Sequence, residues 1–108
     1  MARVLAVVPD LMLGSRVSES LGAAGHEVTV VASLEGVSPE GVELLVADLD
    51  VADPEAVAGF GPPVLGFYSH VEVETRRRAE AAGVDLVVPR SRMSRELPEL
   101  VERLLSGG

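Results

Sequence analysis

Five short apolar runs, separated by segments with helical patterning, constrain the fold of this 108-residue chain more than any other feature. The runs are rich in Val and Leu and do not alternate between apolar and polar residues, which is typical of strands covered on both faces. We therefore expect five buried strands of a parallel sheet, the first of them central. They span residues 3–8, 27–32, 43–47, 63–68 and 84–89.

The segment after the first run has a clear helical pattern. Leu13, Val17 and Leu21 recur at the spacing that places side chains on one face of a helix. Gly25 then supplies the residue type that most often ends a helix in the left-handed conformation. A helix over residues 13–24 is predicted.

The next two connections offer less room for a helix. Between the second and third runs, a stretch containing Gly, Ser and Pro leaves space only for a short helix. After the third run, Asp53, Pro54 and Glu55 combine a capping acid, a first-turn proline and a glutamate favoured by the helix dipole. That helix should end by Gly59, so the second and third helices are both predicted to be shortened.

The last two helices follow the fourth and fifth runs. Residues 72–82 form a charged helical segment closed by Gly83, and an apolar stripe from Met93 to Leu105 predicts the final helix. Pro98 is compatible with that helix only in a first turn, where its missing N–H is not needed.

This alternation predicts an α/β fold with one open parallel five-stranded sheet. Because crossovers between parallel strands are almost always right-handed, the simplest arrangement is the flavodoxin-like strand order 2-1-3-4-5 with helices on both faces. The length allows one hydrophobic core, so we treat residues 1–108 as a single domain.

The composition and net charge of the chain argue against several classes of partner. The net charge of −8 argues against nucleic acid and membrane partners, which both require clustered positive charge. The chain has no cysteine and shows no signal peptide or long apolar span, so we expect a cytoplasmic protein. Arg76, Arg77 and Arg78 are flanked by glutamates, which favours a solvated helix face over a phosphate-binding patch.

Polar residues follow the predicted strands, at the sheet edge where ligands of open parallel sheets bind. We expect these side chains to converge at one edge, with Asp48 and Arg90 close enough to pair. His26, in contrast, is expected to occupy an ordinary turn between a helix and a strand. The strand-end cluster consists of Asp10, Asp48, Asp50, Ser69, His70, Arg90 and Ser91.

At these positions the whole chain resembles the response-regulator receiver family. The motif VVPD places Asp10 at the second residue of the family's acidic pair, and ELLVAD places Asp48 at the phosphorylated aspartate. The resemblance implies a signalling domain that takes a phosphoryl group with the help of magnesium.

Three departures from the family pattern weaken that chemistry. Pro9 replaces the first acid of the pair, Tyr68 stands at the hydroxyl position with Ser69 one step further, and Arg90 replaces a lysine. Magnesium prefers octahedral oxygen coordination, and arginine is planar and bulkier than lysine. We therefore predict that phosphorylation is lost or much weakened, with Arg90 and the amides near Ser69 and Ser91 as the holders of any bound anion.

The favoured hypothesis is a stand-alone receiver-like module that acts by contact with another protein. It is expected to be neither an enzyme nor a holder of a cofactor or metal. A small-ligand or nucleotide-binding Rossmann-like protein is an alternative suggested by AAGHEVTVV, although the single Gly14 after the first strand does not make a G-x-G-x-x-G motif. A structural dimerisation subunit, and hence a homodimer, is the third hypothesis.

Overall fold

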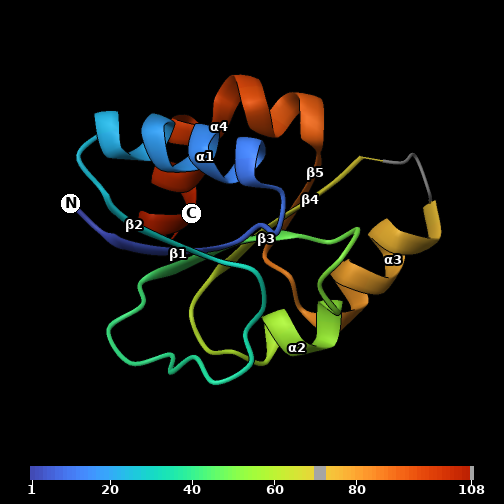
Figure 1. The fold of residues 1–108 in the computed structure, drawn as a ribbon. Coiled ribbons are helices and arrows are strands. Elements are labelled where there is room, and N and C mark those ends of the chain that lie inside the picture. Colours follow the sequence, from blue (N-terminus) through green and yellow to red (C-terminus); the bar gives the residue numbers. More distant parts are fainter. Residues whose placement is uncertain (70–72, 108) are drawn as a thin grey trace.

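A computed structural model describes residues 1–69 and 73–107 and contains an open sheet of five parallel strands with helices on both faces (Figure 1). The strand order is β2-β1-β3-β4-β5, so the predicted order is confirmed; β1 is an interior strand between β2 and β3, and the central strand is β3. The strands are β1 (Arg3–Val7), β2 (Glu27–Val31), β3 (Leu44–Asp48), β4 (Val64–Tyr68) and β5 (Leu86–Pro89).

Two helices cover each face of the sheet. In Figure 1, α1 and α4 lie above the sheet, and α2 and α3 lie below it and to the right. None of the helices in residues 1–69 and 73–107 is long and apolar enough to cross a membrane. The helices are α1 (Leu11–Ala23), α2 (Pro54–Ala58), α3 (Val73–Ala82) and α4 (Arg90–Leu105).

The sheet separates two apolar clusters that together form the core. Phe67 of β4 is fully buried on the side of α1 and α4, where Leu21 and Met93 pack with it. Leu45 of β3 is fully buried on the opposite side, together with Val57 of α2. Every residue of β3 and β4 is buried, which accounts for the apolar runs without alternation in the sequence.

The short helix expected between β2 and β3 is absent, and this part of the prediction is wrong. Residues 32–43 form turns instead, and Leu34, Val37 and Val42 pack against the sheet in place of a helix. Gly36 and Gly41 adopt φ values of 73° and 79°, which a right-handed helix does not contain. The third predicted helix does form, as the five-residue α2.

Pro98 lies where the sequence requires it. Glu96 has a non-helical conformation (φ −120°, ψ 16°), which divides α4 into two segments. Pro98 is the second residue of the C-terminal segment, so its missing N–H falls among the amides that have no helical partner. The N-terminal segment begins at Arg90, directly after β5 and three residues before the apolar stripe.

Candidate functional site

The carboxyl edge of the sheet brings together the predicted site residues that the structure describes. Asp48 is the last residue of β3 and is only 8% exposed. Asp10, Asp50 and Arg90 lie close enough to act on its charge, and Asp50 is hydrogen-bonded to the residue that follows β4, Ser69. His70 lies outside the described residues.

Asp10 caps helix α1. It precedes the first residue of the helix, and its Oδ1 accepts a hydrogen bond from the backbone N–H of Leu13 (3.0 Å). This interaction satisfies one of the amides that have no partner at a helix N-terminus. One carboxylate oxygen of Asp10 is thereby engaged in holding α1.

Asp48, Asp50 and Ser69 form a hydrogen-bonded chain that joins the ends of β3 and β4. The backbone N–H of Asp50 donates to Oδ1 of Asp48 (3.0 Å), which is the geometry of an Asx turn. The backbone N–H of Ser69 then donates to Oδ2 of Asp50 (2.9 Å). Each aspartate therefore accepts a backbone hydrogen bond through one of its carboxylate oxygens.

Burial raises the pKa of the Asp48 carboxyl above its ordinary value. The backbone N–H of Asp50 and the charge of Arg90 act in the opposite direction, whereas the negative charges of Asp50 and Asp10 add to the rise. The net effect is upward, so the ionised form of Asp48 is less favourable in the folded protein than in water.

The predicted ion pair between Asp48 and Arg90 does not form, although both residues are described. Arg90 is exposed at the start of α4 and acts on Asp48 only over a longer distance. The physical reason is that the N–H of Asp50 already meets an oxygen of Asp48, while water solvates the guanidinium. Ser91 is exposed beside Arg90 in the first turn of α4.

The residues at this edge do not fit a magnesium site. Within residues 1–69 and 73–107, no group of three or more His, Asp or Glu side chains is arranged to hold a metal ion. Pro9 offers no side-chain oxygen, and Asp10 is engaged in capping α1. An octahedral shell would need more free oxygen ligands than these side chains provide.

The sequence places Asp50 in the strand-end cluster but does not predict that it links two strands. Its bond to the Ser69 amide depends on the pairing of β3 with β4. The spacing Asp48-Leu49-Asp50 is a usable signal for the first half of the chain, because Asp side chains commonly accept from the amide two residues later.

His26 also differs from its expected role. It follows Gly25 in a turn, as predicted, but its side chain is buried, and its Nδ1 accepts a hydrogen bond from the backbone N–H of Ala2 (3.1 Å). Its Nε2 has no hydrogen-bond partner and lies 3.8 Å from the Glu102 carboxylate. His26 thus fixes the start of β1, at the opposite end of the sheet from Asp48.

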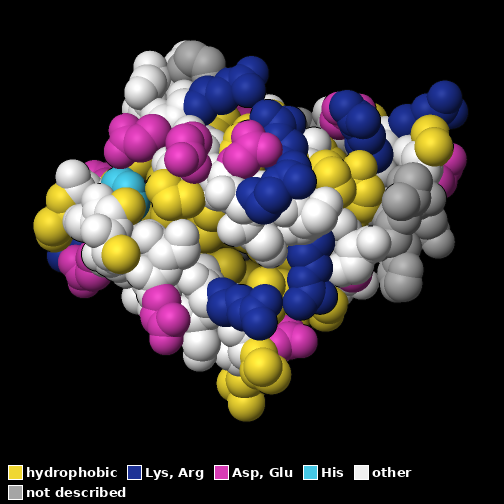
Figure 2. Space-filling model, turned by 90° about the horizontal axis from the view of Figure 1, so that it is seen from above, with side chains coloured by type: hydrophobic (Ala, Val, Ile, Leu, Met, Phe, Trp, Pro, Cys, Tyr) yellow, Lys and Arg dark blue, Asp and Glu magenta, His cyan; other side chains and the backbone are white. Residues whose placement is uncertain are grey.

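Figure 2 looks down on the face formed by α1 and α4. Arginine side chains gather in the centre and right of this view, whereas the buried histidine lies at the left end. The first segment of α4 carries three arginines, at positions 90, 92 and 95. The amino-terminal part of α4 is therefore positively charged, although the chain as a whole is acidic.

Solved structures with a similar fold include response-regulator receiver domains. A CheY-like receiver domain protein from Methanospirillum hungatei is 20% identical over 99% of this chain and 95% of its own, with a TM-score of 0.86. The non-phosphorylated HemR receiver domain from Leptospira biflexa is 22% identical over 98% and 95%, with a TM-score of 0.82. The chemotaxis protein CheY4 from Vibrio cholerae is 21% identical over 96% and 98%, with a TM-score of 0.80.

No family model matches the chain, and no curated protein matches its sequence. Identities near one fifth combined with nearly complete coverage show a common fold and leave the function to be argued from the site. The chain therefore has the fold of CheY-like receiver domains, as its strand-end residues had suggested.

Proposed function

We propose that this protein is a stand-alone receiver-like signalling module that acts by contact with another protein and not as an enzyme. The proposal has two parts. Phosphoryl transfer to Asp48 is lost or much weakened, and the contact is made by a surface formed by α3, β5 and α4, here called the contact face.

The hydrogen-bonded chain of Asp48, Asp50 and Ser69 supports the first part of the proposal, that phosphoryl transfer to Asp48 is lost or much weakened. A carboxylate that accepts a phosphoryl group needs cations nearby to neutralise the incoming charge. Here the nearest additional carboxylates, those of Asp50 and Asp10, place negative charge beside Asp48. The Asp50 carboxylate also occupies the Ser69 amide, a donor that could otherwise stabilise an anion at this edge.

The exposure and charge of α3 and α4 support the second part. Ala79 is the one fully buried residue of α3, so most of that helix faces solvent. Arg77 on α3 and Arg95 on α4 are exposed. Exposed guanidinium groups can pair with carboxylates in a bidentate way, which suits an acidic surface on the partner.

The phosphorylation test uses acetyl phosphate and magnesium, followed by intact-mass measurement. We expect no stable phosphoryl adduct on the native protein, because Asp50 and Asp10 repel the donor, Arg90 opposes them only from a distance, and the side chains do not hold the metal. Asp48→Ala is the control for non-specific modification. An adduct that forms on the native chain and disappears in Asp48→Ala would overturn this part of the proposal.

The contact face can be tested by site-specific cross-linking, because the chain contains no cysteine. A photo-cross-linker is attached to Arg77→Cys on α3, and to Glu35→Cys in the loop between β2 and β3 as the matched control. A partner captured from the cells of origin through position 77 and not through position 35 supports the proposal. Capture through position 35 alone would place the contact elsewhere.

A further inference from the structure

The outer edge of β2 is a free sheet edge on the side of the molecule away from β5. Within the described residues, β2 pairs only with β1. It is rich in β-branched residues, with the sequence EVTVV, and three of its five residues are exposed. It has no proline and no lysine, the residues that natural proteins often use to block such an edge.

Two residues of β2 direct their backbone groups outward. The N–H of Glu27 donates to the carbonyl oxygen of Ala2 (2.9 Å), so residues 27, 29 and 31 face β1. In a strand of a parallel sheet the direction of the backbone groups alternates, and Val28 and Val30 therefore present their N–H and C=O groups outward. A strand lying beside β2 would meet these groups.

A hollow of about 420 Å³ lies between β2 and α1. Its walls are small or apolar, and they include Val30, Gly14 and Ser18, with Glu19 at one side. Gly14 keeps the hollow open, because a Cβ at that position would lie 3.0 Å from Cγ1 of Val30. An apolar side chain is the occupant that fits this lining.

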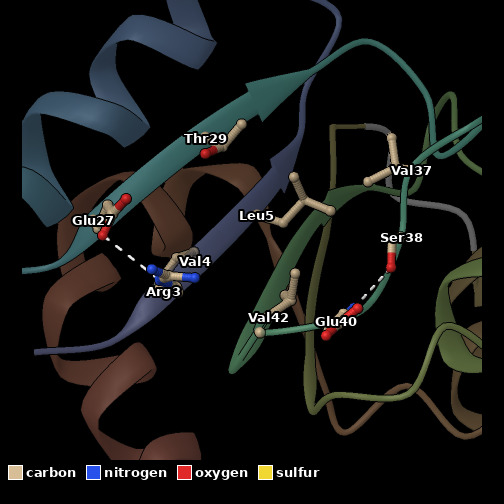
Figure 3. Close-up of a pocket in the computed structure, with 10 residues that line it drawn as sticks. Arg3, Val4, Leu5, Glu27, Thr29, Val37, Ser38, Glu40 and Val42 are labelled. Atoms are coloured by element: carbon tan, nitrogen blue, oxygen red, sulfur yellow. Dashed lines mark hydrogen bonds and ion pairs between the residues drawn. The ribbon is translucent and has the colours of Figure 1, made fainter.

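A second hollow, of about 300 Å³, lies on the other face of the sheet (Figure 3). Its lining includes Leu5 of β1 and Val42 of the loop, together with the carboxylates of Glu27 and Glu40. Arg3 of β1 also lines it, and its Nε lies 3.7 Å from the Glu27 carboxylate, so Glu27 is already part of an exposed ion pair. Thr29 of β2 is a small side chain that also lines this hollow. A long basic side chain placed outside the edge can reach over Thr29 toward the carboxylates.

The distribution of charge also indicates which kind of segment would bind at the edge of β2. Residues 1–69 contain ten acidic residues and two arginines, whereas residues 70–108 contain seven of each, so the whole net charge of −8 belongs to the part of the chain that contains β2. Glu19 lines one hollow; Glu27 and Glu40 line the other, where Arg3 pairs with Glu27, so acidic side chains outnumber basic ones in both linings. The edge therefore favours a basic segment and disfavours a second copy of this acidic chain.

We propose that the edge of β2 binds an extended basic segment of another protein, which adds to the sheet as a sixth strand. Successive side chains of a strand point to opposite faces. The bound segment would alternate apolar residues, which enter the hollow beside α1, with lysine or arginine residues, which reach the carboxylates on the other face. Backbone hydrogen bonds to Val28 and Val30 would supply the pairing.

The probe is a fluorescent ten-residue peptide of alternating valine and lysine, and binding to the full chain is followed by fluorescence polarisation. We expect it to bind at least tenfold more tightly than a peptide of alternating valine and glutamate. A third peptide keeps every lysine but replaces two valines by proline, which cannot extend a sheet. It should also bind at least tenfold more weakly, because charge alone does not create the pairing.

Variants of the protein localise the interaction. Glu19→Arg combined with Glu40→Arg reverses one charge at each hollow and should weaken peptide binding at least tenfold. Glu74→Arg combined with Glu80→Arg reverses two charges on α3, which packs beside β5 at the opposite edge of the sheet, and should alter affinity less than twofold. Val30→Pro removes one outward N–H and leaves the bonds to β1, so it should abolish binding in a protein whose circular dichroism is native.

If Val30→Pro does not fold, hydrogen exchange of the backbone amides in the native chain still locates the binding site. In the native chain, the peptide should slow exchange at the amides of Val28 and Val30 and leave those of β5 unchanged.

The proposal is wrong if the lysine and glutamate peptides bind equally, if no binding is seen, or if the double charge reversal at the hollows has no effect. A dimer in sedimentation that excludes the peptide would assign the edge to a second copy. None of these results bears on Asp48 or on the contact face, so the two proposals fail separately.

Discussion

Asp48 is a buried carboxylate whose ionised form is disfavoured by burial and by the charges of Asp50 and Asp10. A folded-state pKa above the unfolded value means that the folded protein releases the Asp48 proton less readily than the unfolded chain. The contribution of this group to stability is therefore most favourable below its ordinary pKa of 3.8 and is lost as pH rises toward the folded value.

Replacement of Asp48 by Asn should consequently raise the melting temperature at pH 7 by a few degrees. The amide oxygen still accepts from the N–H of Asp50, while the buried charge is removed. The gain should shrink below pH 3.8, where Asp48 is protonated in both states. Glu99→Gln, which removes an exposed charge on α4, is the control, and an equal gain there would contradict the explanation.

The side chains packed around Gly66 of β4 leave little room for a Cβ atom at this position. A Cβ at this position would lie 2.6 Å from Cδ1 of Leu49 and 3.1 Å from Cγ1 of Val84. Gly66→Ala should therefore destabilise the protein by about 1–3 kcal/mol through overpacking. Gly22→Ala in α1 is the matched control, because its Cβ would meet no atom within 4 Å. The control should be neutral or stabilise the protein by up to about 1 kcal/mol in urea unfolding.

At the scale of elements, one arginine joins the two helices on the lower face of the sheet. Arg78 of α3 donates to Asp53 (2.7 Å) and to Glu55 (3.0 Å), at the start of α2. The Arg78 hydrogen bond lowers the pKa of Glu55 to about 2. Since α2 has only five residues, it depends on such contacts more than on helix propensity.

Removal of the Arg78 side chain should make α2 less stable and change how the stability of the protein depends on pH in acid. Because the pKa of Glu55 is lowered from 4.5 to about 2, the favourable interaction is present above pH 4.5 and is lost as pH falls to about 2. Arg78→Met should lower the melting temperature slightly at pH 7 and less at pH 2, and should speed amide exchange in residues 54–58. Arg77→Met, which removes a neighbouring exposed arginine, should change neither measurement.

At the scale of the whole molecule, the charge is distributed unevenly. The net charge of −8 comes from residues 1–69, where acidic residues outnumber arginines by ten to two. Repulsion among like charges destabilises a compact state and is screened by salt over distances of about 10 Å at 0.1 M ionic strength.

Moderate salt should therefore stabilise this protein. Between 0.02 and 0.3 M sodium chloride the melting temperature should rise by a few degrees, because repulsion within residues 1–69 outweighs the exposed ion pairs. The variant Glu35→Gln combined with Glu40→Gln should melt higher at low salt and respond less to added salt. A melting temperature that falls with salt in the native chain would show that the ion pairs dominate.

The sequence alone determined the number of strands, their order and the edge at which the site residues meet. Runs such as LLVAD and VLGFY are apolar without alternation, which permits only strands covered on both faces, and the handedness of crossovers then fixes the topology. Local signals were equally sufficient for the helix start at Asp53-Pro54-Glu55 and for the position of Pro98.

Tertiary structure decided which polar groups meet and which segments lack a helix. The bond between Asp50 and the Ser69 amide, and the absence of an Asp48–Arg90 ion pair, depend on how the ends of β3, β4 and β5 are placed. Residues 32–43 pack on the sheet through Leu34, Val37 and Val42, which satisfies the core without a helix. These outcomes follow from competition among contacts between residues distant in sequence, and periodicity within a segment carries no information about such contacts.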